Sequence, residues 1–341
     1  MEIVRGDPFA GEKLELLRSF LAGQGLDYDE EIQTSFLLME DGRIAATGSR
    51  HGHTLKCVAV SPECRGEGYA ASVLSLLTRD GVEAGYSRLF LYTKPCSAPS
   101  FQDMGFFPVA SVRGAALMEN RRDGIGQFVR GVRQTDWQGD IGCVVVNCDP
   151  FTNGHLYLVE QASAACDYLY IFVLSENRGY FPPDVRMNLV REGAAHIPNA
   201  AVCSTGDYLI SSATFPAYFI KDKIRTAQVG CSLDLEIFAE HFAGPLGIRR
   251  RFVGTEPYCQ VTRAYNEQMK AFLPARGIGV VEIPRFAVGG EAVSASRVRA
   301  LVAEGRLKEI APLVPAGTMR YLERLVKDGY SQSGLAAILS S

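Results

Sequence analysis

The 341-residue chain has no long apolar run near its start and no surplus of basic residues. A membrane-spanning helix needs about 20 consecutive apolar residues, and a signal peptide needs a shorter apolar run behind basic residues. The sequence therefore predicts neither a membrane span nor a secretion signal. Its formal net charge of −3, from 35 basic and 38 acidic residues, argues against the basic surface with which proteins bind nucleic acids.

Paired cysteines are also missing. The nine cysteines are scattered along the chain, and no two of them form a Cys-x-x-Cys pair. Disulfide frameworks and structural zinc sites use short, regular cysteine spacings, so the scattered cysteines predict reduced thiols in a cytoplasmic protein. His51 and His53 have no cysteine or carboxylate at ligand spacing beside them. We therefore predict a loop pair there and no metal ligands from the protein.

The chain contains no internal repeat and no low-complexity segment. A length of 341 residues is typical of two domains, and 47% hydrophobic with 21% charged residues is typical of a globular protein with a core. Residues 120–140 are polar and contain glycine, which favours a domain junction there. We therefore predict one domain over residues 1–130 and a second over residues 140–341.

The most informative stretch is an apolar run, residues 141–146, followed by a tight turn that contains Thr152, Gly154 and His155. Apolar residues then recur at helical spacing, which predicts a buried strand, a short loop and a helix that begins at the loop. A helix start offers unpaired N–H groups and a partial positive charge, so it attracts an anion such as phosphate. Gly154 lets the backbone approach closely, and His155 can stabilise charge on phosphorus.

Residues 149–155 have the sequence Asp-Pro-Phe-Thr-Asn-Gly-His. This run resembles the (H/T)xGH signature of the nucleotidyltransferase superfamily. The resemblance implies transfer of AMP or CMP from a nucleoside triphosphate with release of pyrophosphate, and it implies catalytic roles for Thr152 and His155. The ATP-binding residues that it implies in this part of the chain are Asn147, Asp149, Pro150, Phe151, Thr152, Gly154 and His155.

A second phosphate-binding feature lies at residues 293–299, where a Ser-x-Ser-x-x-Arg pattern opens a predicted helix. Ser294 is a natural N-cap, and hydroxyls, amides and a guanidinium at one helix start suit β- and γ-phosphates. The pattern resembles the second motif of the same superfamily. It implies ATP binding by Ser294, Ser296, Arg297 and Arg299. Arg299 fits the family spacing best and is the catalytic candidate, whereas a plain capping box followed by solvated arginines is the alternative.

From residue 141 onward, strands and helices alternate along the chain. This alternation predicts a Rossmann-like parallel sheet with right-handed crossovers, and ligands of such sheets bind beyond the carboxyl ends of the strands. The turn with Thr152 lies at such an end. The predicted strands cover residues 141–146, 168–174, 201–203, 251–253 and 278–283, and a predicted helix covers 184–197.

Candidates for binding the acceptor follow other strands. Ser175 and Arg178 lie after the second strand, where nucleotidyltransferases usually meet their acceptor, and Asp207 opens a polar and aromatic loop that predicts a substrate lining. Arg186, on the following helix, either serves phosphate or pairs with a carboxylate. Glu256 follows another strand, and we predict that it contacts the adenine side or a metal-bound water.

The N-terminal third predicts a different, α+β fold. Asp41 and Gly42 lie between two strand-like runs, which predicts a hairpin, and a third strand over residues 55–60 leads into a glycine-rich loop at 65–70. An amphipathic helix follows the loop, and a strand is predicted over residues 88–92.

This order of strand, Arg-x-x-Gly-x-Ala loop, helix, strand and a later Gly-Phe pair resembles acetyltransferases of the GNAT type. The resemblance implies that loop amides hold the pyrophosphate of a CoA-like group. Phe101 stands where many such enzymes have a tyrosine general acid, and phenylalanine cannot protonate a thiolate. The domain is thus predicted to bind a CoA-like group, with its own catalysis open. The implied residues are Val60, Arg65, Gly66, Gly68, Tyr69 and Ala70.

A GNAT-like domain followed by a nucleotidyltransferase, with the segments 211–216, 234–238 and 252–258, resembles the citrate (pro-3S)-lyase ligase family over about residues 35–305. The resemblance implies an AMP-forming acid–thiol ligase that uses ATP, with Mg²⁺ on its phosphates, and acetate. It implies that the enzyme acetylates the thiol of a dephospho-CoA-type prosthetic group on the acyl-carrier subunit of citrate lyase. No nucleic acid or membrane is implied as a partner.

Two alternatives stay open at this point. An adenylyltransferase that acts on a phosphate acceptor in coenzyme A or NAD synthesis would carry the same run at residues 149–155, although the N-terminal domain counts against it. A binding or regulatory protein with two relic sites would explain Phe101, but it would not explain two intact phosphate motifs.

Overall fold

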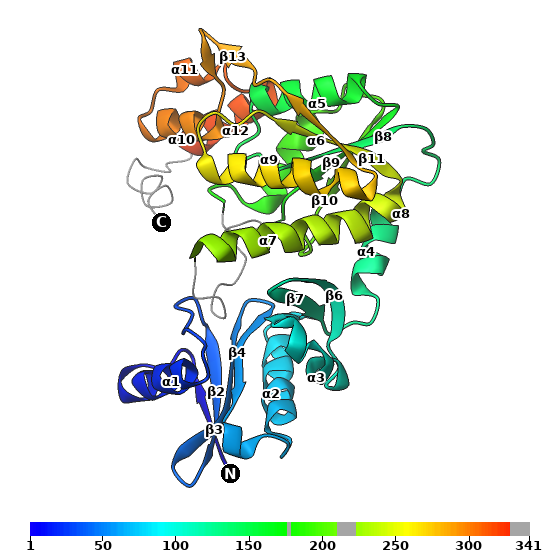
Figure 1. The fold of residues 1–341 in the computed structure, drawn as a ribbon. Helices are drawn as coiled ribbons and strands as arrows, with labels where there is room; N and C mark the ends of the chain where they lie inside the picture. Colours follow the sequence, from blue (N-terminus) through cyan, green and yellow to red (C-terminus); the bar gives the residue numbers. More distant parts are fainter. Residues whose placement is uncertain (176–178, 210–222, 328–341) are drawn as a thin grey trace. The chain divides into compact units, whose positions relative to one another are not determined.

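The computed structural model describes residues 1–175, 179–209 and 223–327, which form two compact units (Figure 1). The first unit runs from Met1 to Gln127 and includes helix α7 (Lys223–Ile237), although α7 lies within the range predicted for the second domain. Helix α7 belongs there because it packs on strands β6 and β7 of that unit. No helix within the described residues has both the length and the apolar character that crossing a bilayer requires.

The first unit is built on a seven-stranded sheet with the strand order β1-β2-β3-β4-β5-β7-β6. The predicted hairpin is confirmed: β2 and β3 pair antiparallel, and both Asp41 (φ 46°) and Gly42 (φ 73°) take the left-handed conformation that a tight hairpin turn requires. The strands are β1 (Glu2–Gly6), β2 (Thr34–Glu40), β3 (Arg43–His51), β4 (Thr54–Val60), β5 (Phe90–Thr93), β6 (Phe107–Val112) and β7 (Ala115–Glu119).

An opening in this sheet lies between β4 and β5. The two strands are parallel, but they pair only through Thr54 with Phe90 and Leu55 with Leu91, at their amino ends. Strand β4 also has a bulge against β3, where Cys57 adopts a φ of 53°. The carboxyl end of β4 then leads into helix α2, which packs along β3 and β4. The helices of this unit are α1 (Gly11–Gly23), η1 (Pro62–Cys64), α2 (Tyr69–Glu83), η2 (Pro95–Ser97), α3 (Ala98–Asp103) and α7.

The segment predicted as a polar junction contains helix α4 (Gly124–Val132), with Ile125 and Val129 buried. The buried carboxylate of Glu119 accepts a hydrogen bond from the N–H of Ile125 (2.9 Å), which satisfies the start of this helix. The sequence hides α4 because three of its nine residues are glycine.

The second unit is built on a five-stranded sheet in the order β10-β9-β8-β11-β12, and every neighbouring pair is parallel. The predicted parallel sheet is thus confirmed. The first strand, β8, lies in the centre, so the chain builds one half of the sheet and then crosses to the other side of β8 to build the second half. The strands are β8 (Ile141–Val146), β9 (Tyr168–Val173), β10 (Ala200–Ser204), β11 (Ile248–Gly254) and β12 (Gly279–Ile283).

Helices cover this sheet and extend it. Helix α5 packs against β8, β9 and β11, and α6 packs against β9 and β10. The predicted helix over 184–197 ends earlier, at Gly193. A smaller core contains buried residues of α10 and α12, among them Leu301 and the fully buried Leu322. The elements are α5 (Asn153–Ala164), α6 (Pro183–Gly193), η3 (Phe238–Ala243), α8 (Gly244–Leu246), α9 (Gln260–Phe272), η4 (Pro274–Arg276), β13 (Ala287–Val288), β14 (Glu291–Ala292), α10 (Ala295–Ala303), α11 (Leu307–Ile310) and α12 (Ala316–Lys327).

Gly48 on β3 provides a test of the packing in the first unit. A Cβ at this position would lie 2.4 Å from Cγ1 of Val73 and 2.7 Å from Cδ1 of Leu77, both on α2. We expect Gly48→Ala to lower the free energy of unfolding in urea by about 1–3 kcal/mol, because the core is overpacked. The matched control is Gly131→Ala on α4, where nothing lies within 4 Å of the added Cβ. That variant should be at least as stable as the parent, so equal stability of both variants would contradict the packing.

Candidate active site

A cavity of about 600 Å³ opens at the carboxyl ends of β8, β11 and β12. This is the point at which the sheet changes its direction of growth, and open parallel sheets bind their ligands there. The cavity brings together residues from both predicted phosphate motifs with residues that follow β11 and β12. The predicted site residues that line it are Asn147, Thr152, Gly154, His155, Glu256, Ser294 and Ser296.

Thr152 and His155 hold each other at the start of α5. Thr152 is the N-cap, and its Oγ1 accepts the N–H of His155 (3.3 Å), while Nδ1 of His155 accepts the backbone N–H of Thr152 (3.1 Å). A backbone N–H can only donate, so Nδ1 must carry a lone pair and the proton of the neutral ring lies on Nε2. His155 therefore offers the cavity a hydrogen-bond donor with a fixed ring orientation.

The electrostatics of the site keep the His155 ring neutral. Burial, followed by the positive charge of Arg285, lowers the pKa of His155 from 6.5 to about 4. A neutral imidazole donates through Nε2 without a protonation step, so the donor is in place throughout the physiological pH range.

Gly154 has two roles at the same helix start. A Cβ there would lie 3.1 Å from the backbone oxygen of Val293, so the glycine lets the start of α5 approach the segment before α10. Asn153 donates its N–H to the carbonyl of Leu313 (2.8 Å), whereas the N–H of Gly154 has no acceptor among the described residues. The close approach of Gly154 to Val293 was not expected from the sequence. The unpaired N–H of Gly154 leaves one amide available to an anion.

The start of α10 faces the cavity with a similar set of donors. The side chain of Ser294 caps this helix by accepting the N–H of Arg297 (3.2 Å). In the described part of the chain, nothing accepts the N–H groups of Ala295 and Ser296, and both residues line the cavity. Two helix starts, those of α5 and α10, thus contribute free amides to one cavity.

Arg299 and Asp149 form a second layer beside the cavity rather than part of its lining. Arg299 donates to the carbonyl oxygen of Asp149 and to the hydroxyl of Ser296 (3.0 Å), and its guanidinium lies 4.3 Å from the ring centre of Tyr180. The carboxylate of Asp149 is buried and accepts the N–H groups of Tyr180 (3.0 Å) and Phe181 (2.8 Å). Arg297 forms an ion pair with Glu291 (2.6 Å) and points its charge there.

Three other predicted residues lie in the surrounding core. Phe151 is fully buried, and its ring stacks on that of His155 with a centroid separation of 6.0 Å. Pro150 is buried beside it. Arg186 has no exposed surface and donates to the carbonyl oxygens of Phe181 (3.0 Å) and Asn147 (3.0 Å), so its guanidinium supports the loop after β8. A contact of Arg186 with phosphate or with a carboxylate stays a prediction.

Glu256 is held by three partners. One carboxylate oxygen accepts the N–H groups of Tyr258 (3.0 Å) and Cys259 (3.1 Å) before α9, and the other pairs with Arg285. Sequence reasoning missed Arg285, although it stands two residues after the last parallel strand. A systematic inspection of the residues after each strand would have found it.

The described acceptor candidates, Ser175 and Asp207, do not line the cavity. The hydroxyl of Ser175 lies 2.5 Å from that of Ser204, and Asp207 is exposed. Arg178 and the part of the aromatic loop at residues 210–216 lie outside the described residues.

The candidate loop for a CoA-like group in the first unit lies between β4 and α2. Arg65 is exposed, and Gly66 (φ 88°) and Gly68 (φ 85°) adopt the left-handed conformation, which is why glycine stands at both positions. The loop follows Val60 at the carboxyl end of β4 and ends at Ala70, in the first turn of α2. Phe101 on α3 packs against the core of this unit.

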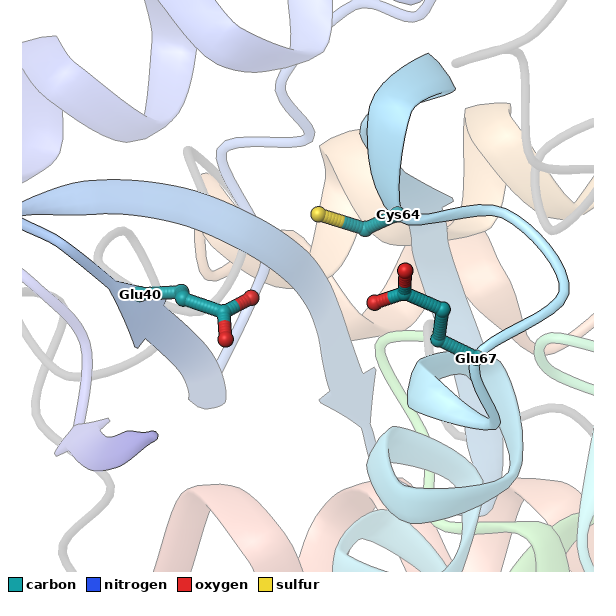
Figure 2. A group of neighbouring side chains, drawn as sticks. All are labelled: Glu40, Cys64 and Glu67. Carbon is teal, nitrogen blue, oxygen red and sulfur yellow. The ribbon is translucent and has the colours of Figure 1, made fainter.

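Figure 2 shows Glu40, Cys64 and Glu67 beside this loop, with one ligand atom from each within 4.8 Å of the others. The hydroxyl of Tyr69 donates to Glu40, and this hydrogen bond raises the pKa of Tyr69 to about 12. Side-chain hydrogen bonding accounts for the position of Glu40, and we assign no metal to the group.

Comparison with known proteins finds a matching family model for each of the two units. The model of the citrate lyase ligase C-terminal domain matches residues 141–322, and that of the acetyltransferase (GNAT) family matches residues 7–106. The citrate (pro-3S)-lyase ligase of Escherichia coli (strain K12) is 39% identical over 323 residues, which cover 93% of this chain and 92% of that protein. The same enzyme from Klebsiella pneumoniae is 39% identical over 92% of this chain and 93% of its own length.

The chain belongs to the citrate (pro-3S)-lyase ligase family. Membership confirms the resemblance drawn from the sequence, and it makes the protein an enzyme with a GNAT-type unit and a nucleotidyltransferase-type unit. A phosphopantetheine adenylyltransferase of Streptococcus gordonii is also similar, at 26% identity over 54% of this chain. That similarity leaves nearly half of the chain unmatched, so the family is favoured over the adenylyltransferase alternative.

The state of the His155 ring can be tested directly. We expect ¹⁵N NMR of the imidazole to show a neutral ring with the proton on Nε2 from pH 7 down to about 5. Because the folded pKa is about 4 against 6.5 in the unfolded chain, the unfolded chain binds a proton that the folded chain does not. The His155 contribution to the free energy of unfolding is therefore intact above pH 6.5 and falls as the pH falls toward 4. A ring that titrates near its ordinary pKa would contradict the geometry.

Proposed function

We propose that this enzyme activates acetate with ATP and transfers the acetyl group to the thiol of the prosthetic group on the acyl-carrier subunit of citrate lyase. AMP and pyrophosphate are released. The observation that carries the proposal is the cavity at the switch point of the sheet, where two helix starts and His155 offer free donors, in a chain 39% identical to named citrate lyase ligases.

In the first step an oxygen of acetate attacks the α-phosphorus of ATP. A bond from that oxygen to phosphorus forms, the bond to the bridging oxygen of pyrophosphate breaks, and pyrophosphate leaves with the electron pair. Nε2–H of His155 and the N–H of Gly154 stabilise the charge on the α-phosphate, and the amides of Ala295 and Ser296 hold the departing pyrophosphate. Positioning and charge stabilisation suffice for this displacement, so no covalent nucleophile is required.

Mg²⁺ enters this proposal with the phosphates of ATP. Glu256 is the one residue with a carboxylate among the described residues that line the cavity. Its oxygens pair with Arg285 and accept two backbone N–H groups. The lining fits an ion that arrives on the nucleotide and keeps its remaining ligands as water. Bound there, Mg²⁺ supplies charge neutralisation for two anions that meet.

In the second step the carrier thiol releases its proton to solvent and attacks the carbonyl carbon of acetyl-adenylate through sulfur. A carbon–sulfur bond forms, the bond from the carbonyl carbon to the phosphate oxygen breaks, and AMP leaves. The loop at residues 65–70 is the candidate for binding the CoA-like part of the prosthetic group, because its glycines expose backbone amides. Phe101 supplies no proton, so the GNAT-type unit binds rather than catalyses in this proposal.

The deciding experiment is acetate-dependent exchange of labelled pyrophosphate into ATP. Exchange with acetate and without carrier protein supports carboxylate adenylation. Exchange with phosphopantetheine or a nucleotide acceptor, and none with acetate, would favour the adenylyltransferase alternative. No exchange with any acceptor, even after the carrier protein is added, would contradict an adenylate mechanism.

We expect His155→Ala to lower the exchange rate about 100- to 1,000-fold, because one preorganised donor to the α-phosphate is lost. The matched control is His196→Ala, since His196 is exposed and pairs with Glu160 (2.9 Å) away from the cavity. The control should exchange at the parental rate. Exchange by a folded His155→Ala protein at that same rate would exclude the proposed role.

Arg65→Ala tests the division of the two steps. Arg65 is exposed on the loop before α2. We expect the variant to keep acetate-dependent pyrophosphate exchange and to transfer the acetyl group to the carrier thiol about 10-fold more slowly, because a contact to the CoA-like group is lost. A single-turnover assay with labelled acetate separates the steps, and equal losses in both would show that they are not divided in this way.

A further inference from the structure

Arg285 is the charged residue whose position the proposed reaction has not yet used. It lies two residues beyond β12, lines the cavity, and has 26% of its side chain exposed. His155 lines the same cavity, and the positive charge of Arg285 contributes, after burial, to the lowered pKa of His155. An arginine that points into a cavity with free amides is suited to a phosphate oxygen.

The guanidinium of Arg285 has acceptors for Nε and Nη2, whereas its Nη1 faces none among the described residues. Nε donates to the carbonyl oxygen of Thr255 (2.7 Å), Nη2 pairs with Glu256, and the backbone N–H donates to the hydroxyl of Thr255 (3.1 Å). Within the described residues, nothing accepts a hydrogen bond from Nη1. These contacts fix the plane of the fork before a ligand binds, so little rotamer entropy is lost when one does.

The other cationic side chain that lines the cavity is buried. Arg251 is 3% exposed, donates through Nη2 to the hydroxyl of Tyr265 (3.1 Å), and lies 4.4 Å from the ring centre of Phe238. Arg299 donates to Asp149 and Ser296 beside the cavity. Among the described lining residues, Arg285 is therefore the cation best placed to meet an incoming anion.

Glu256 explains why Arg285 stays in place. Its side chain is 7% exposed, and the hydrogen bonds from Tyr258 and Cys259 orient the carboxylate toward the guanidinium. A carboxylate with this many partners is a fixed counter-ion for the guanidinium. A contact of Glu256 with the adenine side or a metal-bound water stays a prediction.

We propose that Nη1 of Arg285 binds the phosphate chain of ATP next to His155, and that Glu256 is the positioning residue that holds Arg285. The inference rests on the proposed function, because it names a further phosphate ligand in the same cavity. Arg285 completes a set of donors whose other members are the amides at the starts of α5 and α10.

The test is ATP binding by titration calorimetry, with no acetate and no carrier protein present. We expect Arg285→Gln to weaken ATP binding about 10- to 100-fold, as is typical when a hydrogen bond to a charged group is lost. Arg285→Lys should recover part of the affinity, because it keeps the charge and loses the fork. The matched control is Arg263→Gln: this arginine donates to the carbonyl of Glu256 (3.0 Å) but does not line the cavity, and its variant should bind ATP as the parent does.

A second variant separates phosphate binding from a structural role. Arg285→Gln leaves the buried Glu256 without its partner, which can harm folding. The double variant Arg285→Gln/Glu256→Gln removes both charges, and we expect it to fold and still to bind ATP weakly. Parental ATP affinity in the double variant would show that Arg285 only balances Glu256, and it would overturn the proposal.

The ring of His155 gives a readout that is independent of turnover. In Arg285→Gln the pKa of His155, followed by NMR, should rise toward its ordinary value, and in Arg263→Gln it should stay as in the parent. An unchanged His155 pKa in Arg285→Gln would place the guanidinium away from the catalytic ring and overturn the assignment. If the parent protein binds no ATP, the proposed function itself fails; if the parent binds ATP and Arg285→Gln binds it equally well, only the assignment of Arg285 fails.

Discussion

The reciprocal hydrogen bonds between Thr152 and His155 are the interaction on which the site depends. They end the loop after β8, begin α5 at a defined residue, and fix the imidazole with its proton on Nε2. The same bonds occupy the N–H of His155, so the amide of Gly154 is the one that α5 presents to the cavity. One capping arrangement therefore decides the helix start, the tautomer and the free donor.

A second constraint is which backbone N–H groups around the cavity have an acceptor in the protein and which do not. Asp149, Glu256 and the carbonyl of Leu313 take up the backbone N–H groups that are not needed for a ligand. The N–H groups of Gly154, Ala295 and Ser296 at the starts of α5 and α10 have no acceptor within the described chain and line the cavity. This contrast gives the cavity its preference for an anion more than any net charge does.

The buried carboxylate of Asp149 links the site to its surroundings. It binds the backbone of Tyr180 and Phe181 after β9, and it lies 3.7 Å from Nη1 of Arg299 on α10. The loops after β8 and β9 and the second phosphate motif thus share one carboxylate. A buried charge with several partners is costly to disturb, which explains how three separate segments keep one geometry.

Local patterns in the sequence were sufficient for the strand–turn–helix at residues 141–164, the hairpin at Asp41 and the cap of α10, because each depends on neighbours in the chain. The alternation of strands and helices was sufficient to predict the parallel sheet. Tertiary packing decided the rest. It brought Arg285 into one cavity with His155, buried Arg186 and Phe151 in the core, paired Glu256 with Arg285, and placed α7 with the first unit. A side chain's partner across the fold depends on strand order and burial, and neither can be read from spacing along the chain.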